Sequence, residues 1–288
     1  MTNGPLVDLG DLTKPATALV EKISEAVGGI FRPHQIVRVA RAEAEAGLIR
    51  AEADIAVTDL HRRALRRFLD EEARSQGNIE SIASMAIPLL DADSTPSEMS
   101  SDWIANFFDK SRIVSDEAMQ ELWARVLAGE ANRPGAFSRR TVNLIGDLDQ
   151  YDAQLFSTLC GFAWKISGAS VPIISDLDAN PYEKHDIHFS SLSHLESLSL
   201  IRFDNKGGFK IYGLPSTVTV TYFDNPLELS LPAHSEGTLH IGRVFLTIAG
   251  QELATVCNAT PVDGFYEHVR SIWASRSLCP PFPDPIPS

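Results

Sequence analysis

The longest stretch that favours one kind of secondary structure runs from residue 34 to residue 76, with no proline and a single glycine, Gly47. It is rich in alanine, arginine, glutamate and leucine, which are strong helix formers. An unbroken helix over these 43 residues would be roughly 65 Å long. Because a small domain is narrower than that, part of the helix must project from a globular body or pair with another helix.

A series of positions spaced by 3.5 residues follows this helix, as in the seam of a coiled coil. Its apolar members are Val37, Ala44, Leu48, Ala51, Ile55, Leu65 and Leu69. The small residues Ala44 and Ala51 would let a second helix approach closely. The pattern leaves two hypotheses open, an intramolecular helical hairpin and self-association of two copies through the seam.

The densest basic run of the chain lies in the same helix, at Arg62, Arg63, Arg66 and Arg67. Acidic residues at four-residue spacing from these arginines allow opposite charges to pair along one helix face. A solvated, self-paired face is the simpler interpretation. A contact with phosphate or nucleic acid is the alternative.

An amphipathic segment from Lys14 to Phe31 precedes the long helix, with Leu19 and Ile23 on its apolar face. This pattern favours a helix packed on its neighbour, and a helix lying on a membrane surface is the alternative. We expect Gln76 to Asn78 to interrupt the long helix and a short helix to follow. Residues 1–95 thus form a predicted helical arm, which ends in a polar linker.

Residues 100–148 predict a compact helical module, with Ser115 and Ser138 as helix N-caps. Asp149 then caps a helix that should continue to Ser167, because its apolar residues recur at helical spacing and Gly168 can end it. Cys160 is expected to lie in the core of that helix.

Residues 149–277 mix helix and strand. We expect a helix at 190–199, then two strands, at 200–203 and 209–212, paired as a two-stranded wing, and a β-hairpin insertion at 218–231 that turns at Asp224 to Pro226. A strand at 244–246 and a helix capped by Thr247 follow. The fragments SLSHLESLSLIRF and VFLTIAGQELATV resemble the winged helix-turn-helix superfamily.

The helix at 190–199 would be the recognition helix of such a module. It would expose Ser191, Ser193, His194, Glu196 and Ser197, and it has no arginine or lysine. Because DNA recognition relies on those cations, packing or protein contact is favoured over DNA binding. The fold class predicted is therefore mainly α with a C-terminal α+β part: a long N-terminal helical arm, a helical module, a winged-helix-like domain with a β-hairpin insertion, and a proline-rich disordered tail at 278–288.

Composition narrows the functional classes. The net charge of −13 excludes a generally basic nucleic-acid coat. The N-terminus has no signal-peptide pattern, and no run of apolar residues is long enough to span a bilayer. We therefore expect a cytoplasmic protein.

The sequence has no P-loop, no dinucleotide-binding glycine motif and no metalloprotease motif. We accordingly predict no catalytic, cofactor-binding or metal-binding residues. His185, Asp186 and His188 lie on a polar loop and are interpreted as solvated. Cys257 is expected in the core and Cys279 in the tail, where oxidation could form an intermolecular disulfide.

The stretch SDEAMQELWARVLAGEANRPGAFSRRTVNLIGDLDQYDAQLF, from Ser115 to Phe156, resembles a bacterial family known as domain of unknown function 2806. The segment Leu19 to Ala46 is similar to the start of that family, and the resemblance extends over roughly residues 8–257. The ELWARVLAGE segment is also similar to the abortive-infection alpha proteins of bacteria, which implies a role in phage defence. The family implies no catalytic residues.

These observations predict a non-enzymatic interaction protein that associates with itself or binds a protein partner. A nucleic-acid-binding winged-helix regulator is the first alternative. A membrane-acting effector that uses the N-terminal amphipathic helix for peripheral contact is the second.

Overall fold

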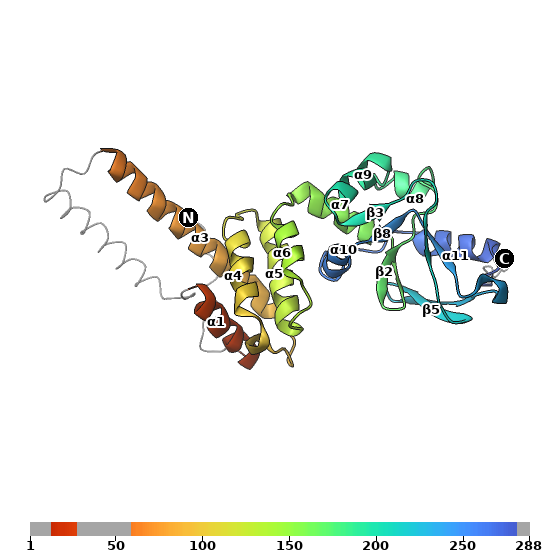
Figure 1. Cartoon of the computed structure of the whole chain (residues 1–288), viewed down its shortest axis with the longest axis horizontal. Helices are drawn as coiled ribbons and strands as arrows, with labels where there is room; N and C mark the ends of the chain where they lie inside the picture. The colour runs from red at the N-terminus through yellow and green to blue at the C-terminus, as the bar shows by residue number, and fades with distance from the viewer. Residues whose placement is uncertain (1–12, 28–58, 281–288) are drawn as a thin grey trace, which may run out of the picture. The chain divides into compact units, whose positions relative to one another are not determined.

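The computed structural model describes residues 13–27 and 59–280. The chain divides into two compact units, Met1–Gly146 and Asp147–Ser288. Helices dominate, and the second unit adds small antiparallel sheets (Figure 1), as the sequence predicts. Within the described ranges, no helix combines the length and the apolar composition that a membrane crossing requires.

The first unit is helical. Its elements are α1 (Lys14–Val27), α3 (Asp59–Ala86), α4 (Ser101–Ser111), α5 (Glu117–Asn132) and α6 (Arg139–Ile145), with 3₁₀ turns η2 (Ile87–Leu89) and η3 (Pro96–Glu98). α3 packs on α5, and α1 and α6 pack on α4. The predicted arm at 1–95 falls within this unit, and so does the predicted module at 100–148 except for its last two residues, which begin the second unit. An aromatic cluster forms the centre of its core, with the ring of Phe107 against those of Trp103, Phe108 and Trp123.

The interruption expected at residues 76–78 is absent, because α3 continues through it to Ala86. Gly77 disfavours a helix by only about 1 kcal/mol, and tertiary contacts beyond it compensate. The buried Asn78 side chain donates to the Arg112 carbonyl at 2.8 Å and accepts from Gln120 Nε2 at 3.1 Å. Ile79 and Ile82 then enter the core.

Most of the predicted helix N-caps are confirmed. Ser138 caps α6 by accepting the Thr141 N–H. Asp149 and Asp152 form a reciprocal capping box at the start of α7 (Gln150–Cys160). The cap of α5 is Asp116 and not Ser115, because the Ser115 hydroxyl contacts Asn78 instead.

Glu130, the last residue of the ELWARVLAGE segment, is a buried carboxylate that fixes the loop after α5. Its Oε1 accepts the Gly135 N–H at 2.7 Å and its Oε2 accepts the Phe137 N–H at 2.9 Å. The Phe137 carbonyl in turn accepts the indole N–H of Trp103 at 2.7 Å. The apolar residues of this segment build the core, and its one buried acid holds the loop that covers that core.

Replacing Glu130 by alanine should leave two backbone N–H groups without an acceptor. We expect the free energy of unfolding, measured by urea denaturation, to fall by about 3 kcal/mol. The free energy of unfolding of Glu130→Gln should lie between those of the wild-type protein and of Glu130→Ala, because the amide keeps one acceptor oxygen. The control Glu121→Ala removes only an exposed ion pair with Arg125 and should cost about 0.5 kcal/mol. Equal losses for Glu130→Ala and Glu121→Ala would contradict this role.

The second unit begins with α7 and interleaves short helices with three small sheets. Its helices are α8 (Asn180–Glu183), α9 (Phe189–Ser197), α10 (Ile248–Leu253) and α11 (Phe265–Ser275). Its strands are β1 (Ala163–Ile166), β2 (Ala169–Pro172), β3 (Ile201–Phe203), β4 (Phe209–Ile211), β5 (Thr217–Tyr222), β6 (Asn225–Ser230), β7 (Leu239–Gly242) and β8 (Val244–Leu246). The sheets are β2-β1-β5-β6, β3-β8 and β4-β7, and η4 (Ala233–Ser235) joins β6 to β7.

The helix predicted to continue to Ser167 ends at Cys160 instead, and β1 follows it. Gly161 explains the difference. A Cβ at this position would lie 2.8 Å from the Thr260 carbonyl oxygen, so the Thr260 segment can pack against the end of α7 only because residue 161 has no side chain. The strands β1 and β7 are both missing from the sequence-based expectation.

The expected pairing of 200–203 with 209–212 as a wing is also wrong. β3 pairs with β8, and β4 pairs with β7, both antiparallel. β5 and β6 form an antiparallel pair in which Tyr222 lies opposite Asn225, so the turn is at Phe223 and Asp224 and not at Asp224 to Pro226. Sequence periodicity predicts where strands lie but does not determine which strands pair.

An aromatic cluster fills the core of this unit around Tyr222. The Tyr222 hydroxyl donates to the Gly161 carbonyl at 2.8 Å and accepts the Val262 N–H at 2.6 Å. The ring lies near those of Trp164 and Phe265. A second buried tyrosine, Tyr182, donates to the Ile173 carbonyl at 2.8 Å.

Because of these two tyrosines, we expect the folded protein to lose stability at alkaline pH. Burial raises the pKa of both Tyr182 and Tyr222 from 10.0 to about 12. Between those values the unfolded chain loses phenol protons that the folded chain keeps. The unfolded state therefore binds fewer protons, and stability falls as pH rises from 10 to about 12.

Thermal melts across this pH range test the expectation. The melting temperature should fall more gently with pH in Tyr222→Phe than in the wild-type protein. Tyr212→Phe is the matched control, because Tyr212 is 71% exposed and its removal should leave the wild-type pH dependence. Identical slopes for all three proteins would contradict the assignment.

Candidate interaction surface

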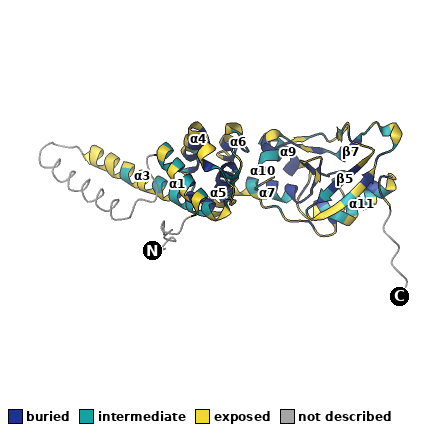
Figure 2. Ribbon diagram, turned by 90° about the horizontal axis from the view of Figure 1, so that it is seen from below, coloured by how far each residue is buried: buried dark blue, intermediate teal, exposed yellow. Residues whose placement is uncertain are grey.

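The first half of α3 exposes apolar side chains. The buried residues of this helix begin at Asn78. Before that point Leu60 is 66% exposed, Phe68 is 57% exposed and Leu65 is 41% exposed, while Leu69 is half-buried. Figure 2 shows the beginning of α3 in the colour of exposed residues. Exposed leucine and phenylalanine this close together on one helix mark a contact surface.

These residues lie on neighbouring rows of the helix surface. Leu60 and Phe68 are eight residues apart and share one row with Ala64 between them, and Leu65 and Leu69 form the next row. Of this set, the seam spacing had predicted Leu65 and Leu69 but missed Leu60 and Phe68. The four-residue spacing of Leu60, Ala64 and Phe68 was the signal that could have found them.

A helix segment of this length gains little stability by itself. Isolated helices of fewer than about 15 residues are marginal in water, and most helix stability in proteins comes from packing of an apolar face. In the described part of the chain, the residues of α3 that are buried are confined to its second half. Burial of Leu60, Leu65 and Phe68 against a partner would therefore stabilise this half of α3.

The predicted basic cluster lies on the same segment and is partly neutralised within the helix. Arg63 Nε lies 3.4 Å from Asp59, and Arg67 Nε lies 3.6 Å from Glu71. Arg62 Nη1 lies 4.0 Å from the same Asp59. Arg66 is exposed beside them. A nucleic-acid contact through Arg62, Arg63, Arg66 and Arg67 stays a prediction.

The structure does not describe the remaining residues of the predicted seam. Val37, Ala44, Leu48, Ala51 and Ile55 lie outside the described residues. The proline-rich segment from residue 281 onwards also lies outside them.

α9, the predicted recognition helix, has its polar residues tied to the protein itself. His194 Nε2 lies 2.6 Å from the Asp152 carboxylate, and the Glu196 carboxylate accepts the Phe203 N–H at 2.9 Å. Ser191, expected on the exposed face, is buried, and its hydroxyl donates to the His188 carbonyl. The contacts of His194 and Glu196 dock α9 onto α7 and β3. Three of the five side chains that were expected to face a ligand are therefore engaged within the protein.

α1, the predicted membrane-surface helix, uses its apolar face inside the first unit. Ala16, Leu19 and Ile23 are buried, and the helix packs on α4 and η3. A bilayer could reach this face only if α1 left the unit. Membrane action therefore stays a prediction that requires such a detachment.

The histidines and cysteines singled out from the sequence occupy structural positions. His185 Nδ1 contacts the Pro181 carbonyl at 2.9 Å, and His188 caps α9. Within residues 13–27 and 59–280, no three histidine, cysteine, aspartate or glutamate side chains gather as metal ligands.

Burial raises the pKa of the Cys160 thiol well above its usual value, and the neighbouring Cys257 adds to the rise, so Cys160 stays protonated and unreactive. Cys279 is buried as well, with its Sγ 3.6 Å from the Arg270 carbonyl. The expectation of an accessible tail thiol is therefore wrong.

The comparison with protein families identifies the chain. A family model described as a protein of unknown function, DUF2806, matches residues 62–270. The chain belongs to this family, as the resemblance of Ser115 to Phe156 indicated. The match excludes the segment Leu19 to Ala46, which had been part of that resemblance. Searches of the curated proteins and of the solved structures found no match.

Proposed function

We propose that this protein is a non-enzymatic interaction protein that self-associates through the first half of α3. The observation that carries the proposal is the exposed apolar surface formed by Leu60, Leu65, Phe68 and the half-buried Leu69. Burying such side chains is worth about 1.5–3 kcal/mol each when the burial is complete. Two copies of the surface would bury one another's apolar rows.

The charges on this segment favour a second copy in antiparallel orientation. The arginines lie toward its start, at 62, 63, 66 and 67, and Asp70, Glu71 and Glu72 follow them. In an antiparallel pair related by a two-fold axis, the basic block of one copy faces the acidic block of the other. The axis would pass near Phe68. A parallel pair would instead bring like charges together.

Light scattering at tens of micromolar tests this proposal. The wild-type protein should have the mass of a dimer, and Leu65→Ser/Phe68→Ser should have the mass of a monomer with unchanged helical circular dichroism. Ile113→Ser is the matched control, because Ile113 is 73% exposed in the same unit but lies outside α3. A monomeric wild-type protein would contradict the proposal and would agree with an intramolecular hairpin instead.

A charge swap tests the orientation in the same experiment. Arg66→Glu/Arg67→Glu should shift the equilibrium toward monomer, because acidic residues would then face the acidic block of the second copy. Adding Glu71→Arg/Glu72→Arg in the same chain should restore the dimer. Failure of the second pair of substitutions to restore association would exclude the antiparallel arrangement.

We further propose that the second unit is an elaborated winged-helix module used for packing or protein contact. The order α7, β1, β2, α8, α9, β3, β8 and α10 supports this assignment, with β1 and β2 as a hairpin after the first helix and β3 and β8 paired as the wing strands. The segment from β4 to β7 would then be an insertion at the tip of the wing. α9 has no arginine or lysine, which favours protein contact over the alternative of DNA binding.

The proposed biological setting is phage defence, and it rests on the similarity of the ELWARVLAGE segment to abortive-infection alpha proteins. Loss of the gene from its native host should raise the plaquing efficiency of phages that the host resists. Complementation with the wild-type chain should reverse this effect, and complementation with Leu65→Ser/Phe68→Ser should not. Unchanged plaquing over a broad phage panel would remove phage defence from the proposal and leave the association data unaffected.

A further inference from the structure

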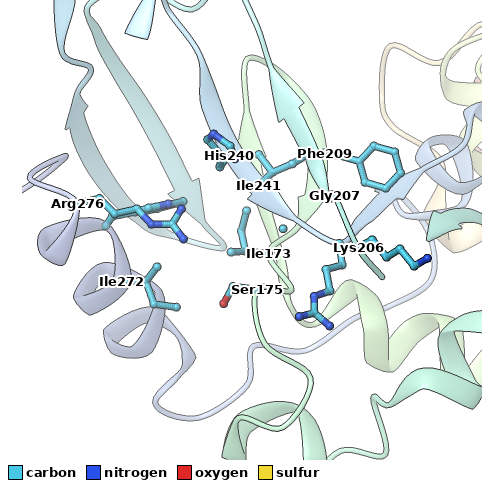
Figure 3. Close-up of a pocket in the computed structure, with 13 residues that line it drawn as sticks. Ile173, Ser175, Lys206, Gly207, Phe209, His240, Ile241, Ile272 and Arg276 are labelled. Carbon is cyan, nitrogen blue, oxygen red and sulfur yellow. The ribbon is translucent and has the colours of Figure 1, made fainter. Parts of the chain in front are cut away.

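The second unit contains an open cavity of about 220 Å³ at the junction of four chain segments. Its walls come from the turn at 206–209, the end of β7, Ser175 beyond β2, and the last turn of α11. Figure 3 shows the Arg276 side chain extending from α11 toward the strands, with Ile173 and Ser175 nearby and His240 on the opposite wall. The amine end of Lys206 extends away from them at the rim.

Close backbone contacts fix the floor of this cavity. The Arg243 N–H donates to the Ile174 carbonyl at 2.7 Å, and the Asp204 N–H donates to the Arg243 carbonyl at 2.9 Å. Gly242 has φ of +101° and Gly208 has φ of +65°, and a Cβ on either would collide with backbone atoms. The two glycines therefore allow three chain segments to meet at one place.

The charged side chains that line the cavity are all basic. Lys206, Arg243 and Arg276 carry full positive charges, His240 lies among them, and none of the lining residues is acidic. This concentration of cations occurs in a chain of net charge −13. The carbonyl end of α11 contributes only about half a negative charge, which three cations outweigh.

Internal contacts leave the guanidinium groups of Arg243 and Arg276 available. Arg243 Nη1 donates to Asn205 Oδ1 at 2.7 Å, a neutral partner that positions the guanidinium. The nearest acid of the turn, Asp204, uses its carboxylate to accept the Lys206 and Gly207 N–H groups, and these bonds lower its pKa. In the described part of the chain, no carboxylate lies within ion-pair distance of Arg243 or Arg276.

Desolvation, followed by the charges of Lys210 and Arg276, lowers the pKa of His240. The cations therefore repel one another, and an anion between them would relieve the repulsion. A built cavity with uncompensated positive charge is the electrostatic condition for anion binding.

We propose that this cavity binds a small multivalent oxyanion of the phosphate class, held by Arg243 and Arg276. A single carboxylate would balance only one of the two guanidinium charges, whereas a phosphate dianion balances both. Guanidinium groups match phosphate oxygens in geometry. The apolar wall of Ile173, Ile241 and Ile272 and the cavity volume leave room for a phosphate group with a small organic remainder.

Isothermal titration of the full chain with inorganic phosphate and with pyrophosphate tests the site. The wild-type protein should bind at least one of them, and Arg276→Gln and Arg243→Gln should each weaken binding about tenfold or more. Arg202→Gln is the matched control, since Arg202 is an exposed cation of the same unit outside the cavity, and it should bind as the wild type does. Circular dichroism and melting curves must show that each variant folds.

Four further outcomes either identify the source of the anion or overturn the proposal. Tighter binding of a sugar phosphate than of inorganic phosphate, lost in Arg276→Gln, would support a small phosphorylated ligand. Phosphate binding that persists unchanged in both cavity variants, or no binding up to about 10 mM, would overturn the proposal. Binding of duplex DNA that Arg276→Gln abolishes, without binding of any small phosphate, would overturn it in favour of a nucleic-acid site. None of these outcomes bears on self-association through α3, which belongs to the other unit.

Discussion

The hydroxyl of Tyr222 connects three chain segments that are distant in sequence. It donates to Gly161 at the end of α7 and accepts from Val262 shortly before α11, while its own residue belongs to β5. Both bonds are buried, so their loss would leave a carbonyl and an N–H unsatisfied at a cost of about 1–3 kcal/mol each. Through Val262 the bond anchors the chain three residues before α11 begins at Phe265. α11 carries Ile272 and Trp273 to one wall of the basic cavity, and Arg276 directly follows it, so the cavity depends on this interior bond.

The first unit has a comparable division between a fixed part and an exposed part. Asn78 and Glu130 satisfy backbone groups inside the helical core, and the second half of α3 is held there. The first half of the same helix carries Leu60 and Phe68 into the solvent. One continuous helix thus contributes both to the core and to the proposed association surface. The two proposed surfaces differ in chemistry, since one is apolar with alternating charge blocks and the other is a cationic cavity.

The predictions from sequence are confirmed most often where a feature depends on neighbouring residues only. The caps at Ser138, Asp149 and Thr247 follow from hydrogen bonds that span three residues. The predictions are wrong where contacts between distant segments determine the extent of a helix. The Thr260 carbonyl packs against Gly161 where α7 ends, and α3 passes through Gly77 because its second half packs on α5.

The sequence by itself determined that the chain is mainly helical, that strands concentrate in its last third, and that it belongs to the DUF2806 family. It also placed Leu65 and the arginine cluster on one helix, since helical spacing is a property of neighbouring residues. The tertiary structure alone decided that β3 pairs with β8, and that Lys206, His240, Arg243 and Arg276 surround one cavity. Strand pairing and helix docking bring these residues together. The free energy of both processes depends on contacts between distant segments, which a local sequence pattern does not predict.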